Sequence, residues 1–135
     1  MKTVLVIDDE VAIAEILEAI ITDGGYRAIL ASNGRQALER VKDNLPDLIV
    51  TDFMMPVLDG AGLIAALNVL PEHRRIPVIM MSSVPESSVA SHCSGYAAFL
   101  RKPFRIGSVL QIIERVIGPA GIADLGDGEC RENGA

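Results

Sequence analysis

The segment from Leu48 to Gly60 constrains the fold more than any other part of the chain. It opens with the apolar run Leu48-Ile49-Val50-Thr51, which is typical of a buried strand, and the run ends on a single carboxylate, Asp52. Pro56 and Asp59-Gly60 then indicate a loop that leads into the next element. Because loops converge at the carboxyl ends of parallel strands, this pattern predicts a functional site around Asp52.

Four more apolar runs predict further strands, and helical patterns separate all five. The other expected strands cover residues 3–7, 27–31, 78–81 and 97–100. The expected helices cover residues 11–23, 34–44, 61–70 and 84–95, and a last amphipathic stretch carries Val109, Ile112, Ile113 and Val116 and ends at Gly118-Pro119. Pro71 should end the third helix, and residues 72–75 should form a polar connection. The helix over 84–95 should be short and weakly held, because serines are indifferent helix formers.

Strands that alternate with helices predict a parallel sheet covered by helices on both faces. Right-handed crossovers leave few topologies, and we expect the flavodoxin-like, doubly wound α/β fold with strand order 2-1-3-4-5. In this order the ends of strands 1 and 3 are neighbours. Asp8 and Asp9, which follow strand 1, should therefore face Asp52.

The length and composition favour one domain. The chain has 135 residues, half of them hydrophobic, which is enough for a single core. We expect this domain to cover residues 1–117. Glycines and acids dominate residues 118–135, which predicts a flexible tail or the start of a linker.

The charge pattern argues against several classes of partner. The formal net charge is −6, and no run of Lys and Arg offers phosphates a cationic surface, so we expect neither nucleic-acid nor membrane binding. The opening apolar run is too short for a signal peptide and leads straight into acids, which indicates a cytoplasmic protein. Cys93 and Cys130 lack metal-ligand spacing, so we expect a packed thiol and an exposed tail thiol, respectively. His73 and His92 should both lie on the surface.

The expected ends of the strands together predict phosphoryl chemistry. Three carboxylates repel one another unless a cation enters, and oxygen ligands suit Mg²⁺ or Mn²⁺. Strand 4 should add the hydroxyl of Ser82 and strand 5 the ammonium of Lys102. Asp52 could then attack phosphorus as a nucleophile, because a carboxylate needs no general base and aspartyl phosphates are known intermediates.

Four motifs in this order resemble the receiver domain of bacterial two-component response regulators. They are Ile7-Asp8-Asp9-Glu10, the segment from Asp52 to Gly60, Ser82, and Lys102-Pro103-Phe104. The resemblance covers Lys2 to about Ile117 and implies that Asp52 accepts a phosphoryl group from a sensor histidine kinase or a histidine phosphotransfer protein. It also implies a signalling module that catalyses its own phosphorylation and dephosphorylation, not a turnover enzyme.

The same resemblance implies a role for each residue of the site. Asp8, Asp9 and Asp52 would bind Mg²⁺ together with the main-chain carbonyl of Met54. Lys102 would be the lysine of the site, Ser82 the switch hydroxyl and Phe99 the switch aromatic. The Lys102-Pro103 peptide bond would be cis.

The implied switch acts on the surface made by the fourth helix, the fifth strand and the last helix. Ser82 would move toward the phosphoryl group, and Phe99 would turn inward to fill the space. The sequence departs from the family here, because Gly95-Tyr96-Ala97-Ala98 stands where Gly-Ala-Asp-Asp is common. The downstream partner, a missing C-terminal output domain, and homodimerisation on phosphorylation stay open.

Taken singly, several of these residues could have purely structural roles, and other functions also have to be considered. Asp8 and Asp9 could cap the first helix, Asp59-Gly60 could be only a turn and helix start, and Phe99 could be core filling. An interaction module of the same fold that works without phosphorylation is the main alternative function. A small aspartate-nucleophile phosphatase is less favoured, because its acids would follow strand 1 as Asp-x-Asp. A nucleotide-binding or flavin-binding module would need a glycine-rich cradle after strand 1, which is absent from the sequence.

Overall fold

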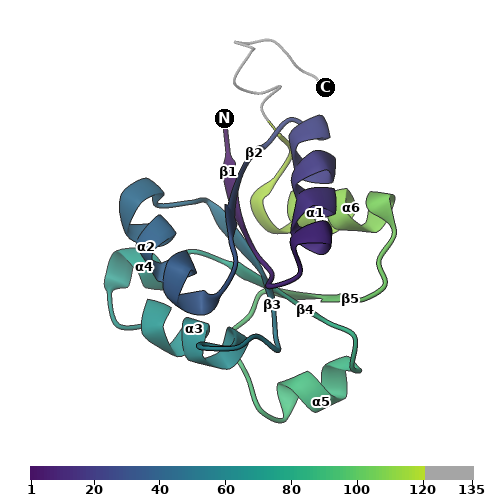
Figure 1. Ribbon diagram of the computed structural model, residues 1–135. Coiled ribbons are helices and arrows are strands. Elements are labelled where there is room, and N and C mark those ends of the chain that lie inside the picture. The colour runs from purple at the N-terminus through teal and green to yellow at the C-terminus, as the bar shows by residue number, and fades with distance from the viewer. Residues whose placement is uncertain (121–135) are drawn as a thin grey trace.

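The structure is a computed structural model that describes residues 1–120. Its five strands are β1 (Thr3–Ile7), β2 (Arg27–Ala31), β3 (Leu48–Asp52), β4 (Val78–Ser82) and β5 (Ala98–Arg101). Its helices are α1 (Val11–Asp23), α2 (Gly34–Asn44), α3 (Gly60–Leu67), α4 (Pro71–Arg74), α5 (Glu86–Ala90) and α6 (Ile106–Ile117). The strands and helices alternate along the chain, apart from the short α4 that follows α3 directly (Figure 1).

The strands form one parallel sheet in the order β2-β1-β3-β4-β5, as predicted. β1 pairs with β3 so that Ile7 lies opposite Thr51, and the next residues are Asp8 and Asp52. The fold is therefore the flavodoxin-like α/β fold that the sequence indicated. Its register brings the first acid after β1 beside the last residue of β3.

Alternate residues of each central strand belong to two separate hydrophobic cores, one on each face of the sheet. On β1, Leu5 and Ile7 belong to the core under α2 and α3, whereas Val4 and Val6 belong to the core under α1 and α6. Figure 1 shows α1 and α6 together on one side of the sheet and α2, α3 and α4 on the other. Because β1, β3 and β4 are buried on both faces, their apolar runs are continuous rather than alternating.

The connection between α3 and β4 differs from the prediction. The third helix ends at Leu67 instead of Leu70, and Pro71 begins the separate helix α4 instead of only ending α3. Proline suits the first helical position, because its missing N–H would be unpaired there and its φ already matches the helix. His73, expected on the surface, lies in α4 and is only 9% exposed, so that prediction was wrong.

The other elements follow the prediction closely. α5 has only five residues, in line with the weak helix expected over 84–95. Cys93 is buried and free, as predicted, and His92 is exposed. Cys130 and most of the predicted tail lie outside the described residues. Within residues 1–120, no helix has the length and apolar character needed to cross a membrane.

Two contacts hold the loop after Asp52 at the end that leads into α3. Asp59 is the N-cap of α3 and accepts a hydrogen bond from the Gly62 N–H at 2.8 Å, which confirms it as a helix start. Gly34, the first residue of α2, lies so close to this loop that a Cβ atom there would be 2.6 Å from the Leu58 main-chain oxygen. The start of α2 therefore packs against the loop and can do so only with glycine.

We expect Gly34→Ala to lower the free energy of unfolding by about 1–3 kcal/mol, because the added methyl group overlaps a main-chain atom that cannot move freely. Gly107→Ala in α6 is the matched control, since a Cβ there meets nothing within 4 Å. The control should leave stability unchanged or raise it by up to about 0.5 kcal/mol. Urea unfolding followed by circular dichroism measures both, and equal stability of the two variants would contradict the close approach.

Candidate functional site

Three carboxylates meet at the carboxyl ends of β1 and β3. Oxygen atoms of Asp8, Asp9 and Asp52 all lie within 4.8 Å of one another. Asp8 is 1% exposed and Asp52 is 9% exposed, whereas Asp9 faces solvent. The structure thus brings together the three acids that the sequence predicted to face one another, and it buries two of them.

Local hydrogen bonds orient Asp8 toward the site. Its N–H donates to the Ala31 carbonyl of β2 at 3.2 Å, and its Oδ1 accepts from the Glu10 N–H at 2.9 Å. Glu10, not Asp8 or Asp9, is the N-cap of α1, and its side chain makes no capping hydrogen bond. Capping of α1 therefore does not explain the two aspartates.

Lys102 supplies the positive charge of the site from the end of β5. Its Nζ lies 2.9 Å from Asp8 Oδ2, 3.5 Å from Asp52 Oδ2 and 3.8 Å from Glu10 Oε1. The Lys102 N–H donates to the Ser82 carbonyl at 2.8 Å, which extends the β4–β5 pairing by one residue. The predicted cis peptide bond between Lys102 and Pro103 is present. The proximity of Glu10 was not predicted from the sequence.

Burial and charge act against each other in this cluster. Burial raises the pKa of Asp52 to about 6; the Asp8 and Asp9 carboxylates add to the rise, and Lys102 opposes it. Burial alone would lower the pKa of Lys102, but its hydrogen bond to Asp8 and the charges of Asp8 and Asp52 raise it overall. One ammonium thus faces several carboxylates, and the site retains an excess of negative charge.

Ser82 and Phe99 lie on the strands next to this cluster. Ser82 ends β4, is 2% exposed, and accepts a hydrogen bond from the Val84 N–H at 3.1 Å through its Oγ. Phe99 pairs with Met80 in the sheet, and its half-buried ring lies 6.4 Å from the ring of Tyr96 at an angle of 52°. The Tyr96 hydroxyl in turn donates to Glu86 Oε2 at 3.1 Å. Nothing in the sequence pattern indicated that Tyr96 and Glu86 meet.

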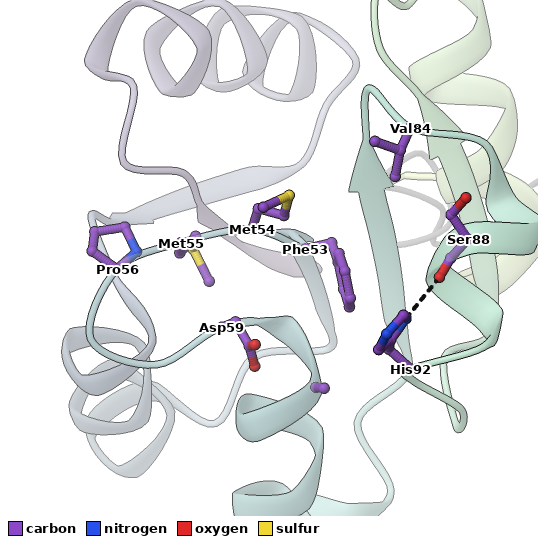
Figure 2. A pocket seen from close by; sticks show the side chains of 9 residues that line it. Phe53, Met54, Met55, Pro56, Asp59, Val84, Ser88 and His92 are labelled. Atoms are coloured by element: carbon purple, nitrogen blue, oxygen red, sulfur yellow. Dashed lines mark hydrogen bonds between the residues drawn. The ribbon is translucent and has the colours of Figure 1, made fainter.

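Two large hollows flank the site, besides a smaller one of 170 Å³ that Asp8 lines. One has a volume of 790 Å³ and lies between the β3–α3 loop and α5, with Phe53, Met54 and Met55 on one side and Val84, Ser88 and His92 on the other (Figure 2). The other, of 410 Å³, is a groove between α1 and the segment after β5. Lys102 lines this groove together with Ile13, Ile16, Ile20, Ser83, Pro103, Phe104 and Ile106. The Met54 side chain is 67% exposed.

The donor atoms of the three acids suit a hard divalent cation. Mg²⁺ prefers oxygen ligands at about 2.0–2.1 Å, so two ligands on opposite sides of the ion are about 4.2 Å apart. The 4.8 Å spread of the carboxylate oxygens needs only a small contraction, or a bridging water, to match this arrangement. A cation here would also offset the excess negative charge, so this acidic cluster could hold a metal.

Comparison with known proteins points to one family. Residues 4–114 match the family described as "Response regulator receiver domain". Among curated relatives, "Probable transcriptional regulator ycf27" of Pyropia yezoensis is 35% identical over 134 residues, which cover 93% of this chain and 54% of the relative. "Transcriptional regulatory protein ZraR" of Escherichia coli O157:H7 is 32% identical over 123 residues, covering 90% of this chain and 27% of the relative. The chain thus spans about half, or less, of these relatives.

Similar solved structures also include response regulators and receiver domains. Chemotaxis response regulator CheY4 of Vibrio cholerae has a TM-score of 0.79 and 29% identity, with 86% of this chain and 98% of that chain covered. The receiver domain of sensor histidine kinase PA1611 from Pseudomonas aeruginosa PAO1 has a TM-score of 0.81 and 28% identity, with 87% of this chain and 98% of that chain covered. The latter structure has a magnesium ion coordinated in its active site cleft.

The raised pKa of Asp52 leads to a testable pH dependence. Its pKa is about 6 in the folded protein against an ordinary value of 3.8, so protonation favours the folded state, and this contribution is lost as pH rises through 6. Asp52→Asn stays uncharged. In metal-free buffer it should therefore be more stable than the wild type by about 1–2 kcal/mol at pH 7–8, and by nothing below about pH 4.

Urea unfolding with a chelator, repeated from pH 4 to pH 8, measures this difference. Asp43→Asn, at an exposed acid of α2, is the matched control and should show no such gain. A gain for Asp52→Asn that is the same at every pH would contradict the electrostatic explanation.

Proposed function

The chain belongs to the response regulator receiver domain family, and on this premise we propose that Asp52 accepts a phosphoryl group from a sensor histidine kinase or a histidine phosphotransfer protein. A receiver domain is a signalling module rather than a turnover enzyme. The observation that carries the proposal is the convergence of Asp8, Asp9 and Asp52 within 4.8 Å of one another at one edge of the sheet, with Lys102 in ion-pairing reach of Asp8 and Asp52.

Each residue has a separate task in the proposed reaction. An Asp52 carboxylate oxygen attacks phosphorus, and the donor's nitrogen leaves as the new O–P bond forms. Lys102 holds a phosphoryl oxygen, for which it must release part of its contact with Asp8. Ser82, whose Oγ accepts from the Val84 N–H, donates its own hydroxyl proton to another phosphoryl oxygen.

The acids would hold Mg²⁺, with Mn²⁺ as a substitute. Asp8, Asp9 and Asp52 would supply carboxylate oxygens and Met54 its main-chain carbonyl. The cation supplies charge neutralisation between the carboxylates and the incoming phosphoryl group. With a pKa of about 6, Asp52 is mostly ionised at pH 7 and can act as a nucleophile without a base.

The proposed output is a change in the surface formed by α5, β5 and α6. Ser82 moves toward the phosphoryl group, and the Phe99 ring turns inward into the vacated space. The half-buried position of Phe99 supports this role, because the part of its side chain that faces solvent can still become buried. The buried Ser82 directly before the β4–α5 connection supports it as well.

The lengths of the relatives bear on the downstream partner of this receiver. We place the receiver at residues 1–117 and a tail or linker at 118–135, of which 121–135 are not described. Relatives named as transcriptional regulators are about twice as long as this chain or longer. The downstream partner is therefore either a separate protein or an output domain, and a homodimer on phosphorylation is a further proposal.

The groove between α1 and the segment after β5 is the surface on which we place the phosphodonor. It begins at Lys102 and is otherwise mainly apolar, with Ile16 49% and Ile106 65% exposed. A histidine that transfers its phosphoryl group to Asp52 must be carried by a domain resting beside the site. The groove is continuous with the site and offers that domain apolar surface to bury.

The first test is the intact mass of the protein after incubation with acetyl phosphate and Mg²⁺. We expect one added phosphoryl group, which is lost in Asp52→Asn and in the presence of a chelator. Asp43→Asn should react like the wild type. An adduct that persists in Asp52→Asn would contradict the assignment of the acceptor, and no adduct at all would favour an interaction module that works without phosphorylation.

Ile16→Glu tests the docking groove. The introduced charge should slow phosphotransfer from a sensor kinase that phosphorylates the wild type by at least about tenfold, because the charge would be buried in the complex. Phosphorylation by acetyl phosphate should stay within about twofold of the wild type.

Val69→Glu is the matched control, since Val69 is 76% exposed between α3 and α4 and does not line the groove. Equal effects of the two substitutions on kinase-dependent phosphotransfer would rule out the groove as the docking surface.

A further inference from the structure

Tyr96 connects two parts of the proposed switch. It lies just before β5, and its hydroxyl donates a hydrogen bond to Oε2 of Glu86, the first residue of α5, at 3.1 Å. Its ring contacts the Phe99 ring at a centroid distance of 6.4 Å. The same side chain thus touches the start of α5 and the aromatic residue of β5. The sequence marks this position as a departure from the family, where alanine is common.

Little else in α5 itself fixes its position. Of its five residues only Val89 is buried, and its N-cap, Pro85, makes no side-chain capping bond. The face that carries Ser88, followed by His92, borders the 790 Å³ hollow, which separates it from the β3–α3 loop (Figure 2). His92 bonds back to the Ser88 carbonyl, so it adds no anchor to another element. The hydrogen bond between Tyr96 and Glu86 therefore adds a tie to the segment before β5, beside the anchor that the buried Val89 supplies in the core.

We propose that Tyr96 is a positioning residue that holds α5 and the Phe99 ring in the resting arrangement of the switch. The proposal rests on the function proposed above. If Phe99 turns inward, its ring moves away from Tyr96, and the aromatic contact is lost. Tyr96 therefore favours the unphosphorylated arrangement, and phosphorylation of Asp52 must overcome this contact before α5 is released.

The hydroxyl is a donor throughout the neutral pH range. Burial and the adjacent Glu86 carboxylate raise the pKa of Tyr96, so the hydroxyl keeps its proton. The ring and the hydroxyl can be removed separately. Tyr96→Phe deletes the bond to Glu86 and keeps the ring contact, whereas Tyr96→Ala deletes both.

Hydrogen exchange in the metal-free protein tests the hold on α5 without any phosphorylation. Tyr96→Phe should speed exchange of the amides of Val89, Ser91 and His92 roughly three- to tenfold. Tyr26→Phe is the matched control, because the Tyr26 hydroxyl donates to the Gly118 carbonyl at 3.0 Å, at the end of α6. Tyr26→Phe should leave the exchange rates of the α5 amides unchanged. Unchanged α5 exchange in Tyr96→Phe, or equal acceleration in Tyr26→Phe, would overturn the proposal.

Binding of fluoroberyllate with Mg²⁺, measured by calorimetry, tests the effect on the switch. Tyr96→Ala should bind this phosphoryl mimic about three- to tenfold more tightly than the wild type, because the resting arrangement has lost its aromatic contact. Equal or weaker binding would overturn this part of the proposal. If the wild type itself did not bind fluoroberyllate, the proposed function would fail, and the exchange experiment would still decide whether Tyr96 positions α5.

Discussion

The burial of Asp8 and Asp52 beside a single lysine sets the charge of the site and limits what it can bind. Buried carboxylates lose hydration, and their mutual repulsion adds to that cost. Lys102 compensates in part through its 2.9 Å contact with Asp8, but the raised pKa of Asp52 shows that the compensation is incomplete. The protein thus maintains a local excess of negative charge that a bound cation can offset.

The fold supplies the rigid frame that such an arrangement needs. Strands β1, β3 and β4 are buried on both faces, and each contributes alternate side chains to two cores. The register of β1 with β3 sets the separation of Asp8 and Asp52. The hydrogen bond from the main-chain N–H of Lys102 to the Ser82 carbonyl positions the lysine at the same edge of the sheet. The close packing of Gly34 against Leu58 holds the loop that follows the acceptor.

The region around α5 has fewer anchors than the rigid frame of the site. This helix is short, borders a large hollow, and is tied to the segment before β5 by the hydrogen bond from Tyr96 to Glu86. A well-held site beside a lightly held helix is a suitable combination for a switch. A small change at Asp52 can then alter the position of α5, whose buried residue in the core under α2 and α3 is Val89.

The sequence by itself determined the order of the strands, the acids at the ends of β1 and β3, and the presence of Ser82 and Lys102 at the ends of β4 and β5. Apolar runs and turn residues mark each strand locally, the right-handed crossover rule gives their order, and a parallel sheet brings all strand ends to one edge. Pro71 misled the prediction, because proline both ends helices and begins them, and in the structure it begins α4, in which His73 is buried. The bond of Lys102 to Asp8 joins residues 94 positions apart, and the contact of Tyr96 with Glu86 joins two loosely patterned segments. Only the tertiary structure decided these contacts and the pKa of Asp52, because they depend on distances between side chains that no local pattern encodes.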